Sequence, residues 1–384
     1  MRNFAKAVMA AAMMAGAAAC GPKYVEPAEG SETGFALSFF RSVNEIVEYD
    51  KNYVISPYSA GVALSMLAEG AEGQTRVEFD DALNNCMFRA IDLGGNDTVV
   101  VKSANSLWLD DNFSVRNRYV GLLQKDFDAF VDVLSFADPA TVKAINNWCS
   151  ENTNGKIDNI IDKLRPDMVM VLANALYFNA PWVKAFAPEA TKEAVFHGLA
   201  GDTKVQMMNT KSTFRYAEYM GCQMVELPYE GGRYAMYVVL PPRNWDANSI
   251  IPHIGESVYD AAMNMLSDRE VVLRMPKVKL ETSLILNEAI QKMGVKSAFT
   301  SSADFKGISA MGPLVLDQVK QKCYIDIAEK GTEAAAVTVA QIRLTAARPG
   351  AQTAAVMTVD RPYLFFIADH ETSNILFAGK VVNL

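Results

Sequence analysis

The sequence predicts a single α+β domain. Patterns typical of helices are concentrated in the early part of the chain and patterns typical of strands in the later part, with no strand–helix–strand repeat between them. Half of the 384 residues are hydrophobic, so the chain can bury a large core. Length alone would permit two domains, but single β-rich domains also reach this size.

The predicted helices carry periodic apolar residues or terminal signals. Phe35, Phe39 and Val43 recur at helical spacing in 31–49. The segment 56–70 begins with Ser56 in the N-cap position and Pro57 in the first turn, and it is apolar nearly all round, which predicts a buried helix. The segment 139–161 predicts an amphipathic helix followed by a turn, and 283–295 predicts a further helix.

The predicted strands are marked by apolar runs and by glycine turns. The continuous apolar run 168–178 is typical of a central strand that is covered on both faces. Two strands flank the pair Gly231-Gly232, and a second hairpin over 361–384 closes the chain.

The first 32 residues lie outside the predicted domain. Arg2 and Lys6 precede a short apolar stretch, which indicates a secretory signal over 1–19 rather than a membrane span. The small residues that lead to Cys20 resemble a bacterial lipoprotein signal, and this implies acylation of Cys20, export, and anchoring at the cell surface or in the periplasm. The alternative is an ordinary signal that leaves Cys20 as a free thiol. Residues 20–32 are then a Pro/Gly/Glu tether.

Composition excludes several classes of function. The net charge is −8 and no long basic run is present, which argues against nucleic-acid binding. The motifs of α/β-hydrolases, zinc proteases and nucleotide-binding proteins are missing, and His197, His253 and His370 have no evident nucleophile beside them. The acidic pairs 80–81 and 110–111 are interpreted as solvated charge, and the other four cysteines as isolated thiols. The sequence therefore predicts neither an enzyme nor a metal protein.

A long stretch of small residues, "EKGTEAAAVTVAQIRLTAARPGAQ" from Glu329, separates two predicted strands. If Thr332–Ala340 formed a strand, one face would carry only small residues and the other would carry the single charge of the segment, Glu333. Gly331 would supply a flexible joint. The stretch can thus be an exposed loop and can also fit into a sheet. The alternative is a surface helix, against which the β-branched residues at 337–339 argue.

Several segments, in order along the chain, resemble the serpin family from about Thr33 to Leu384. They include "YVISPYSAGVALSMLAEGAEGQT", "NALYFNAPW", "ELPYEGGRYAMYVVLP", "EKGTEAAAVT" and "RPYLFFIADHETSNILFAGKVVNL". The resemblance implies a serpin-like fold over 33–384, with eight or nine helices, about three β-sheets and an exposed reactive-centre loop at about 329–361. It also implies a monomeric suicide inhibitor, in which a serine protease cleaves the loop, is held as the acyl-enzyme and is trapped when the loop inserts as a strand.

The resemblance also assigns roles within the loop. By family spacing the reactive bond joins Thr345 and Ala346, with Leu344 and Arg343 before it. The small residues favour an elastase-like serine protease, Leu344 also suits a papain-like cysteine protease, and Arg343 offers a trypsin-like alternative. The hinge consists of Glu329, Gly331, Thr332, Ala334, Ala336 and Thr338.

Outside the loop, the resemblance places two polar groups and one surface helix. Lys277 and Trp182 correspond to the breach at the top of the sheet. The shutter comprises Ser56, Ser59, Asn174 and Gln321, where Gln321 stands in place of the usual histidine. The acidic segment 75–93 covers the helix where some relatives bind heparin, so no glycosaminoglycan and no other cofactor is expected. The alternative function is a non-inhibitory carrier or chaperone with the same fold.

Overall fold

A computed structural model describes residues 30–95, 98–165, 167–311, 313–332 and 353–384. The signal segment, Cys20 and most of the loop, including Ala334 to Ala346, lie outside these ranges. The described part of the chain contains eight α-helices: α1 (Glu32–Asn44), α2 (Pro57–Ala68), α3 (Gly73–Ala82), α4 (Asn117–Phe127), α5 (Pro139–Asn152), α6 (Ala247–Ile250), α7 (Glu256–Met265) and α8 (Asn287–Lys292). None of the helices in these ranges is long and apolar enough to cross a membrane.

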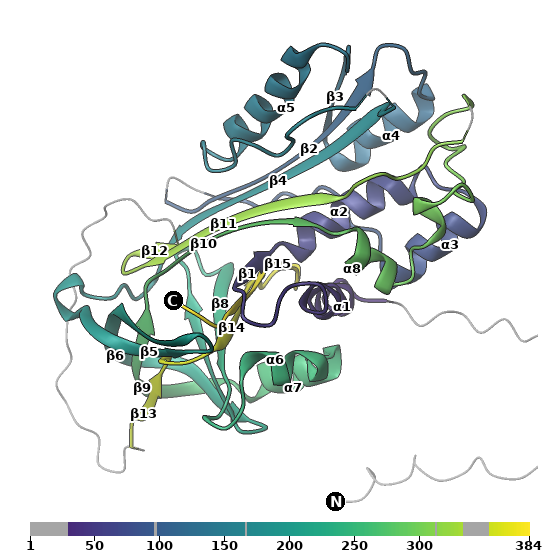
Figure 1. Ribbon diagram of the computed structural model, residues 1–384. Coiled ribbons are helices and arrows are strands. Elements are labelled where there is room, and N and C mark those ends of the chain that lie inside the picture. Colours follow the sequence, from purple (N-terminus) through teal and green to yellow (C-terminus); the bar gives the residue numbers. More distant parts are fainter. Residues whose placement is uncertain (1–29, 96–97, 166, 312, 333–352) are drawn as a thin grey trace, which may run out of the picture.

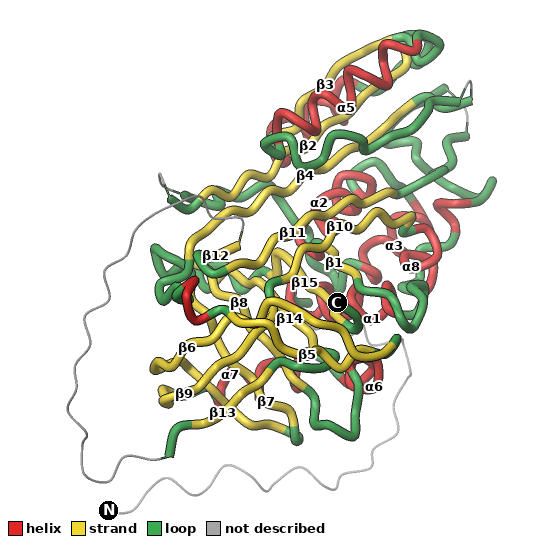
Figure 2. The backbone as a smooth tube through the Cα atoms, turned by 60° about the vertical axis from the view of Figure 1, so that its left-hand side comes forward, coloured by secondary structure: helices red, strands yellow, loops and turns green. Residues whose placement is uncertain are grey.

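The described strands form a six-stranded and a nine-stranded sheet (Figures 1 and 2). In order across the first sheet lie β10 (Val278–Ile285), β11 (Lys320–Ala328), β12 (Gly331–Thr332), β4 (Met170–Pro181), β2 (Val100–Asp110) and β3 (Ala129–Leu134). In order across the second lie β1 (Tyr53–Ile55), β15 (Ile375–Val381), β14 (Tyr363–Asp369), β8 (Tyr234–Leu240), β7 (Cys222–Pro228), β6 (Gly201–Tyr219), β9 (Ser267–Pro276) and β13 (Ala355–Thr358), with β5 (Lys192–Gly198) paired to β6.

The long strand β6 explains why the nine strands form one continuous sheet. Its first part pairs with β5, its middle with β9, and its last residues with β7. The parts of the structure that would otherwise be separate β-sheets are therefore joined through a single 19-residue strand.

Helix α2 lies between the two sheets, where it contacts both β4 and β15. The Ser56 side chain caps it by accepting a hydrogen bond from the Ser59 amide, and Pro57 occupies its first turn. All but one of its 12 residues are buried, which confirms the prediction from its uniformly apolar sequence. Its N-terminus lies beneath the junction of β4 and β11, where the candidate site lies.

Two predicted helices differ from the structure. Over 283–295, Ser283–Ile285 belong to β10 because their backbone pairs with Lys320–Lys322 of β11, and only Asn287–Lys292 is helical. Over 75–93, helix α3 ends at Ala82 and the rest of the segment is non-helical. Asn84 and Asn85 adopt left-handed backbone angles, φ 57° and 55°, which are incompatible with a continuing α-helix.

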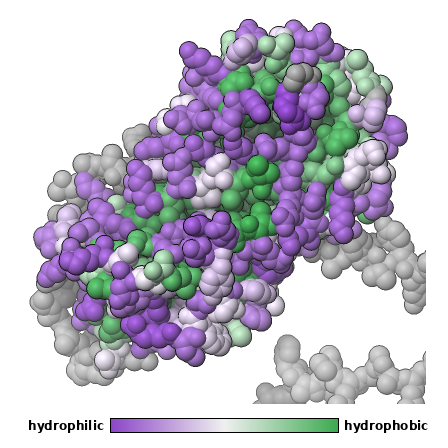
Figure 3. Space-filling view, viewed as in Figure 1, coloured by the Kyte–Doolittle hydropathy of each residue, from purple (hydrophilic) through white to green (hydrophobic). Residues whose placement is uncertain are grey.

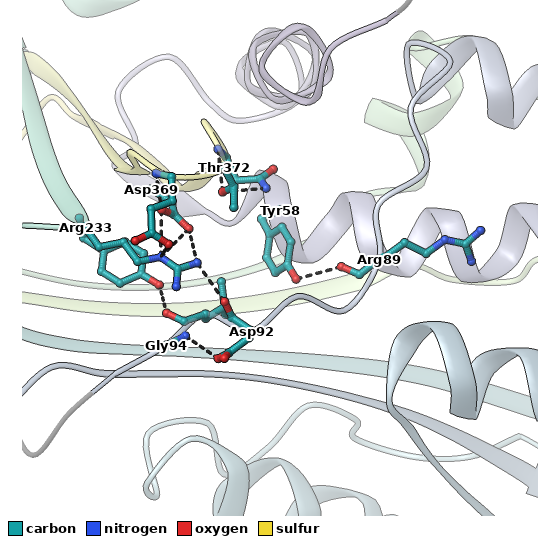
Figure 4. A network of polar contacts seen from close by, with 11 residues as sticks. Tyr58, Arg89, Asp92, Gly94, Arg233, Asp369 and Thr372 are labelled. Atoms are coloured by element: carbon teal, nitrogen blue, oxygen red, sulfur yellow. Dashed lines mark hydrogen bonds and ion pairs between the residues drawn. The ribbon is translucent and has the colours of Figure 1, made fainter.

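Specific contacts hold the non-helical segment 83–95 against the body of the protein (Figure 4). The Tyr58 hydroxyl donates to the Arg89 carbonyl at 3.1 Å, and the Arg233 guanidinium donates to the Asp92 carbonyl at 3.0 Å. Arg233 also pairs at 2.8 Å with Asp369, which is buried. After Ala82 the expected helix is thus replaced by a non-helical segment, 83–95. The one arginine of this segment, Arg89, is paired with Glu69 and Asp126.

The exterior is mainly polar in the orientation of Figure 3, with hydrophobic patches near the centre and the upper end. The four cysteines in the described ranges are free thiols. Burial raises the pKa of Cys149 and of Cys323 to about 12, so neither is a thiolate at neutral pH.

Candidate functional site: a hinge strand at a sheet seam

The junction between β4 and β11, here called the seam, is bridged by a two-residue strand. Thr332 of β12 pairs with Ala180 of β4 on one side and with Ile327 of β11 on the other. Within the described residues β4 and β11 have no ladder of their own, so β12 alone joins the two halves of the sheet by strand pairing. The start of the loop is therefore already part of the sheet.

Thr332 points into the protein. Its side chain is almost completely buried, with 1% of the residue exposed, and its hydroxyl lies 2.6 Å from that of Tyr229. Burial raises the pKa of Tyr229 far above its usual value, so its hydroxyl stays protonated and can donate to Thr332. The position accepts a small side chain with one hydrogen-bonding group and has no room for a charge.

Gly331 fits the narrow space beside β4. A Cβ atom at this position would lie 2.2 Å from the Ala180 carbonyl oxygen and 2.6 Å from the Pro181 Cα, which is too close for any other residue without a backbone shift. The glycine is thus required by the close approach of the two backbones as well as by flexibility.

The base of the loop is fixed by Glu329 and Trp182. The Glu329 carboxylate pairs with Lys277 at 2.9 Å and accepts from the Thr191 hydroxyl at 3.0 Å. Burial would raise the pKa of Glu329, but the hydrogen bonds from Lys277 and Thr191 outweigh it and hold the pKa below its usual value. Trp182 donates from its indole to the Ala328 carbonyl at 3.0 Å and stacks on Tyr229 at 4.4 Å.

Four polar residues lie under the middle of the seam. The Gln321 side chain on β11 accepts from the Ser56 amide at 3.0 Å and donates to the Ser56 carbonyl at 2.9 Å. On the β4 side the Ser59 hydroxyl donates to Asn174. The N-terminus of α2 is therefore hydrogen-bonded to both sides of the seam at the same level. An amide can both donate and accept, so Gln321 fills this position without a titratable group.

Below these residues the seam opens into a cavity of about 760 Å³. Its walls include 168–174 on the β4 side and 313–321 on the β11 side, and its floor includes Ala60, Ala63 and Leu67 of α2. The seam thus has a bridged upper end and an unbridged lower half, in which a further strand could be accommodated.

The residues set aside as non-catalytic have structural partners. His370 lies 2.8 Å from the Tyr237 hydroxyl and His197 2.8 Å from Asp202, and both histidines are exposed. Asp110 accepts from the Phe136 amide at 2.9 Å, and Asp80 pairs with Arg76. Among the residues that the structure describes, no three His, Cys, Asp or Glu side chains are grouped so as to hold a metal ion.

Sequence reasoning brought together Glu329, Lys277 and Trp182 at one end of the seam and the four shutter residues at its middle. It missed Tyr229, which contacts both Thr332 and Trp182, and Thr191, which donates to Glu329. Neither residue has a sequence signal, because its contacts are with residues that are distant in the chain and that only the fold brings beside it. The reactive-bond residues Arg343, Leu344, Thr345 and Ala346 and the hinge residues Ala334, Ala336 and Thr338 lie outside the described residues.

Comparisons with known proteins agree with this architecture. The family model for serpins, described as serine protease inhibitors, matches residues 30–384. The chain belongs to the serpin family. It is 31% identical over 372 residues to a serpin-like protein of Thermococcus kodakarensis, covering 93% of this chain and 86% of the relative, and 32% identical over 381 residues to the leukocyte elastase inhibitor of Sus scrofa, covering 93% and 99%.

Solved serpin structures share the fold. The native state of the thermophilic serpin tengpin superimposes with a TM-score of 0.82 at 28% identity and covers 92% of this chain and 94% of its own. A complex of thyroxine-binding globulin with thyroxine has a TM-score of 0.79 at 24% identity and covers 92% and 98%. A protein named as a serpin and a protein named for the ligand that it binds therefore share this fold.

Proposed function

We propose that this serpin inhibits serine proteases of the elastase type, by loop cleavage followed by insertion of the cleaved loop at the seam. The observation that carries the proposal is the burial of Thr332 in β12, between β4 and β11. The hinge is thus already in register with both neighbouring strands, and insertion would extend an existing strand.

The register of β12 gives the positions that the inserted residues would take. Each step along the loop moves one residue back along β4 and along β11, and residues directly opposite share a face of the sheet. Continued in this way, the strand would place Thr338 between Asn174 and Gln321, where its hydroxyl would meet the polar residues under the seam.

The inward-facing positions between Thr332 and Thr338 would be occupied by alanines. Ala334 would lie beside Phe178 of β4, and Ala336 beside Leu176, both of which are buried. Because these two neighbours are large, small side chains on the inserted strand suit the space beneath the sheet. This matching of small to large side chains supports an inserting loop.

The proposed reactive bond joins Thr345 to Ala346, with Leu344 at the preceding position. A small residue before the cut suits the small primary pocket of an elastase-like enzyme, and the relative named leukocyte elastase inhibitor supports this class. Cleavage at Arg343 would instead indicate a trypsin-like target, and Leu344 would also suit a papain-like cysteine protease.

Incubation with one protease of each type tests the proposal. We expect a complex with the elastase-type enzyme that survives SDS. We also expect a released C-terminal peptide whose mass corresponds to residues 346–384, which begin with Ala346. Mass spectrometry of that peptide separates the Thr345 and Arg343 alternatives. Cleavage by every active protease without a stable complex would contradict inhibition.

A rise in thermal stability after loop cleavage separates an inhibitor from a carrier. Insertion of a strand adds hydrogen bonds and buries side chains, so cleavage should raise the melting temperature of an inhibitor sharply. A carrier whose loop does not insert should melt at nearly the same temperature before and after cleavage.

We further propose that the mature chain is exported, begins at Cys20 and is held at a bacterial membrane by a lipid on that residue. The apolar stretch followed by small residues up to Cys20 supports this. Intact-mass measurement of the mature protein should show the lipid, and Cys20→Ala should release the protein from membranes. A mature N-terminus without lipid in the unsubstituted protein would contradict it.

A further inference from the structure

Three helices end around a second pocket, of about 400 Å³, which shares no lining residue with the cavity at the seam (Figure 1). Helix α1 ends at Asn44, α3 at Ala82 and α8 at Lys292, and all three of these residues line the pocket. The short 3₁₀ helix Ile251–His253 supplies a further part of the wall. The volume lies in the range of about 300–1,000 Å³ that is usual for small-molecule sites.

Four charged residues line this pocket, and two of them neutralise each other. The ammonium group of Lys292 lies 3.1 Å from the carboxylate of Glu45. The other two are Arg41 and Asp81. Among the residues that the structure describes, neither of these two has an ion-pair partner, and they are not paired with each other. The pocket therefore offers one cation and one anion to a ligand.

Arg41 is held in place by neutral partners and keeps donors for a ligand. Its half-buried guanidinium donates to the Ile254 carbonyl at 2.7 Å and to the Ser38 hydroxyl at 2.8 Å. A guanidinium has about five N–H donors, so these two hydrogen bonds leave others free, and its planar fork fits a carboxylate. The hydroxyl of Ser42, which also lines the pocket, can donate as well. This part of the wall suits a carboxylate.

Asp81 supplies the negative charge of the pocket at the end of α3. It is exposed and lies one residue before the end of this ten-residue helix. The last carbonyl groups of a helix carry partial negative charge, which adds to that of the carboxylate. An ammonium group at this end of the pocket would be attracted by both.

A third part of the wall is apolar. Ala82 and Ile251 are buried and Met293 is half-buried, and all three line the pocket. An aliphatic group placed against them would be removed from water together with the apolar surface that it covers, which is favourable. A fitting ligand thus combines a carboxylate, an ammonium group and a short aliphatic chain.

We propose that this pocket binds a free α-amino acid with an aliphatic side chain, with the carboxylate of the ligand at Arg41 and its ammonium group at Asp81. In such a molecule one carbon atom carries both charged groups, so a single small ligand meets both unpaired charges of the pocket. Because Asp81 is exposed to solvent, the affinity should be modest, with a Kd on the order of 0.1–1 mM.

Isothermal titration calorimetry with three probes tests the ligand class. L-leucine carries both charges, N-acetyl-L-leucine lacks the ammonium group, and L-leucinamide lacks the carboxylate. We expect each capped probe to bind on the order of tenfold more weakly than L-leucine, because each leaves one charged residue of the pocket without its partner. Equal affinity for the three probes, or no binding of L-leucine at about 10 mM, would overturn the proposal.

The variant Asp81→Asn tests the location of the site. Asp81 is exposed, so its substitution should leave the fold intact. The matched control is Asp80→Asn, because Asp80 is the adjacent residue of the same helix but pairs with Arg76 at 2.8 Å and does not line the pocket. Arg41 is left unsubstituted because it also holds the Ile254 carbonyl, and L-leucinamide tests its contact instead.

L-leucine should bind on the order of tenfold more weakly to Asp81→Asn and should lose its advantage over N-acetyl-L-leucine in that variant. It should bind to the control as it does to the unsubstituted protein. Unchanged binding to Asp81→Asn, or an equal loss in both variants, would overturn the assignment of the pocket. Neither measurement involves a protease, so the result is independent of the proposed inhibitory function.

Discussion

The two sheets of this serpin differ in how completely their inner strands are paired. In the nine-stranded sheet, β14 has six pairs with β8 and six with β15, and every residue of β14 and β15 is buried. In the six-stranded sheet, β11 has eight pairs with β10 but only two with β12 on its other side. A sheet can accept a new strand only where backbone donors and acceptors lack strand partners, and among these inner strands β11 has such groups below β12.

The buried side chains show the same contrast. The nine-stranded sheet packs large residues such as Phe365, Phe366 and Phe377 with essentially no exposure. The lower half of the seam contains a cavity, and polar side chains make the contacts at its middle and upper end. Tight packing tolerates little change, whereas hydrogen bonds and ion pairs at a cavity can be exchanged for others.

The largest expected effect is that of Thr332→Arg at the upper end of the seam. Thr332 is buried against Tyr229, and a guanidinium there would have to be desolvated without a partner. We expect the variant to be cleaved as a substrate, with the number of inhibitor molecules consumed per protease rising about tenfold or more. Titration of the protease with the variant measures this ratio.

Glu333→Arg is the control for Thr332→Arg, because the next residue of an inserted strand faces the opposite side of the sheet. It should inhibit nearly as well as the unsubstituted protein. An unchanged ratio in Thr332→Arg would contradict the inward orientation on which the proposed insertion depends.

The second effect concerns the fixed sheet and depends on pH. Lys380 of β15 is fully buried, with its ammonium 2.7 Å from the Asn248 side-chain oxygen and 5.1 Å from the Tyr53 ring centre. Burial lowers its pKa from 10.5 to about 8. The unfolded chain therefore binds more protons between pH 8 and 10.5, and the contribution of Lys380 to the free energy of unfolding rises across that window by roughly 2–3 kcal/mol.

Lys380→Met should remove this pH dependence while the remaining groups titrate as before. Urea unfolding at a series of pH values from about 7 to about 10.5 measures the difference between the two proteins. Identical slopes would show that Lys380 does not carry the effect. Inhibition should be little changed, because Lys380 lies in the nine-stranded sheet, away from the seam.

The smallest effect is expected at the base of the loop. The pKa of Glu329 is held below its usual value, so its contribution to stability is complete above pH 4.5 and is lost as pH falls through the lower value in the folded protein. Glu329→Gln should reproduce the acid state at neutral pH at a cost of about 0.5–1 kcal/mol, reduced by the partial exposure of Lys277.

Tryptophan fluorescence can follow this change, since Trp182 contacts Ala328 and Tyr229 beside Glu329. In the unsubstituted protein the emission should shift below pH 4.5, and in Glu329→Gln the shift should be absent. Replacement of Glu270, whose carboxylate pairs with Lys211 at the surface, serves as the control and should leave the shift in place.

Local sequence signals predicted most elements, because the start or end of each of these elements is determined by residues close to it in the chain. Ser56 and Pro57 mark the start of α2, and Gly231-Gly232 marks the turn between β7 and β8. The errors arose where distant partners overruled local preference. The segment 283–285 has a sequence compatible with a helix. Its backbone nevertheless pairs with β11, which is about 35 residues away along the chain.

The candidate site was predicted only in part, because some of its contacts join residues that are distant in the chain. Resemblance to the serpin family supplied Glu329, Lys277, Trp182 and the shutter residues, whose contacts the structure then defined. The contacts of Tyr229 and Thr191, and the ion pairs that Asp158 and Asp162 make with β11, depend on which strands and loops lie side by side. Charges such as Asp162 and Lys320 are ordinary surface residues until the fold brings them to within 3.1 Å.

The sequence by itself determined an alternation of small residues after Gly331, because side chains two apart on a strand must share a face whatever the fold. Only the tertiary structure decided that Thr332 lies inside and that β4 and β11 are unpaired below it, because burial and strand pairing depend on residues far away in the chain.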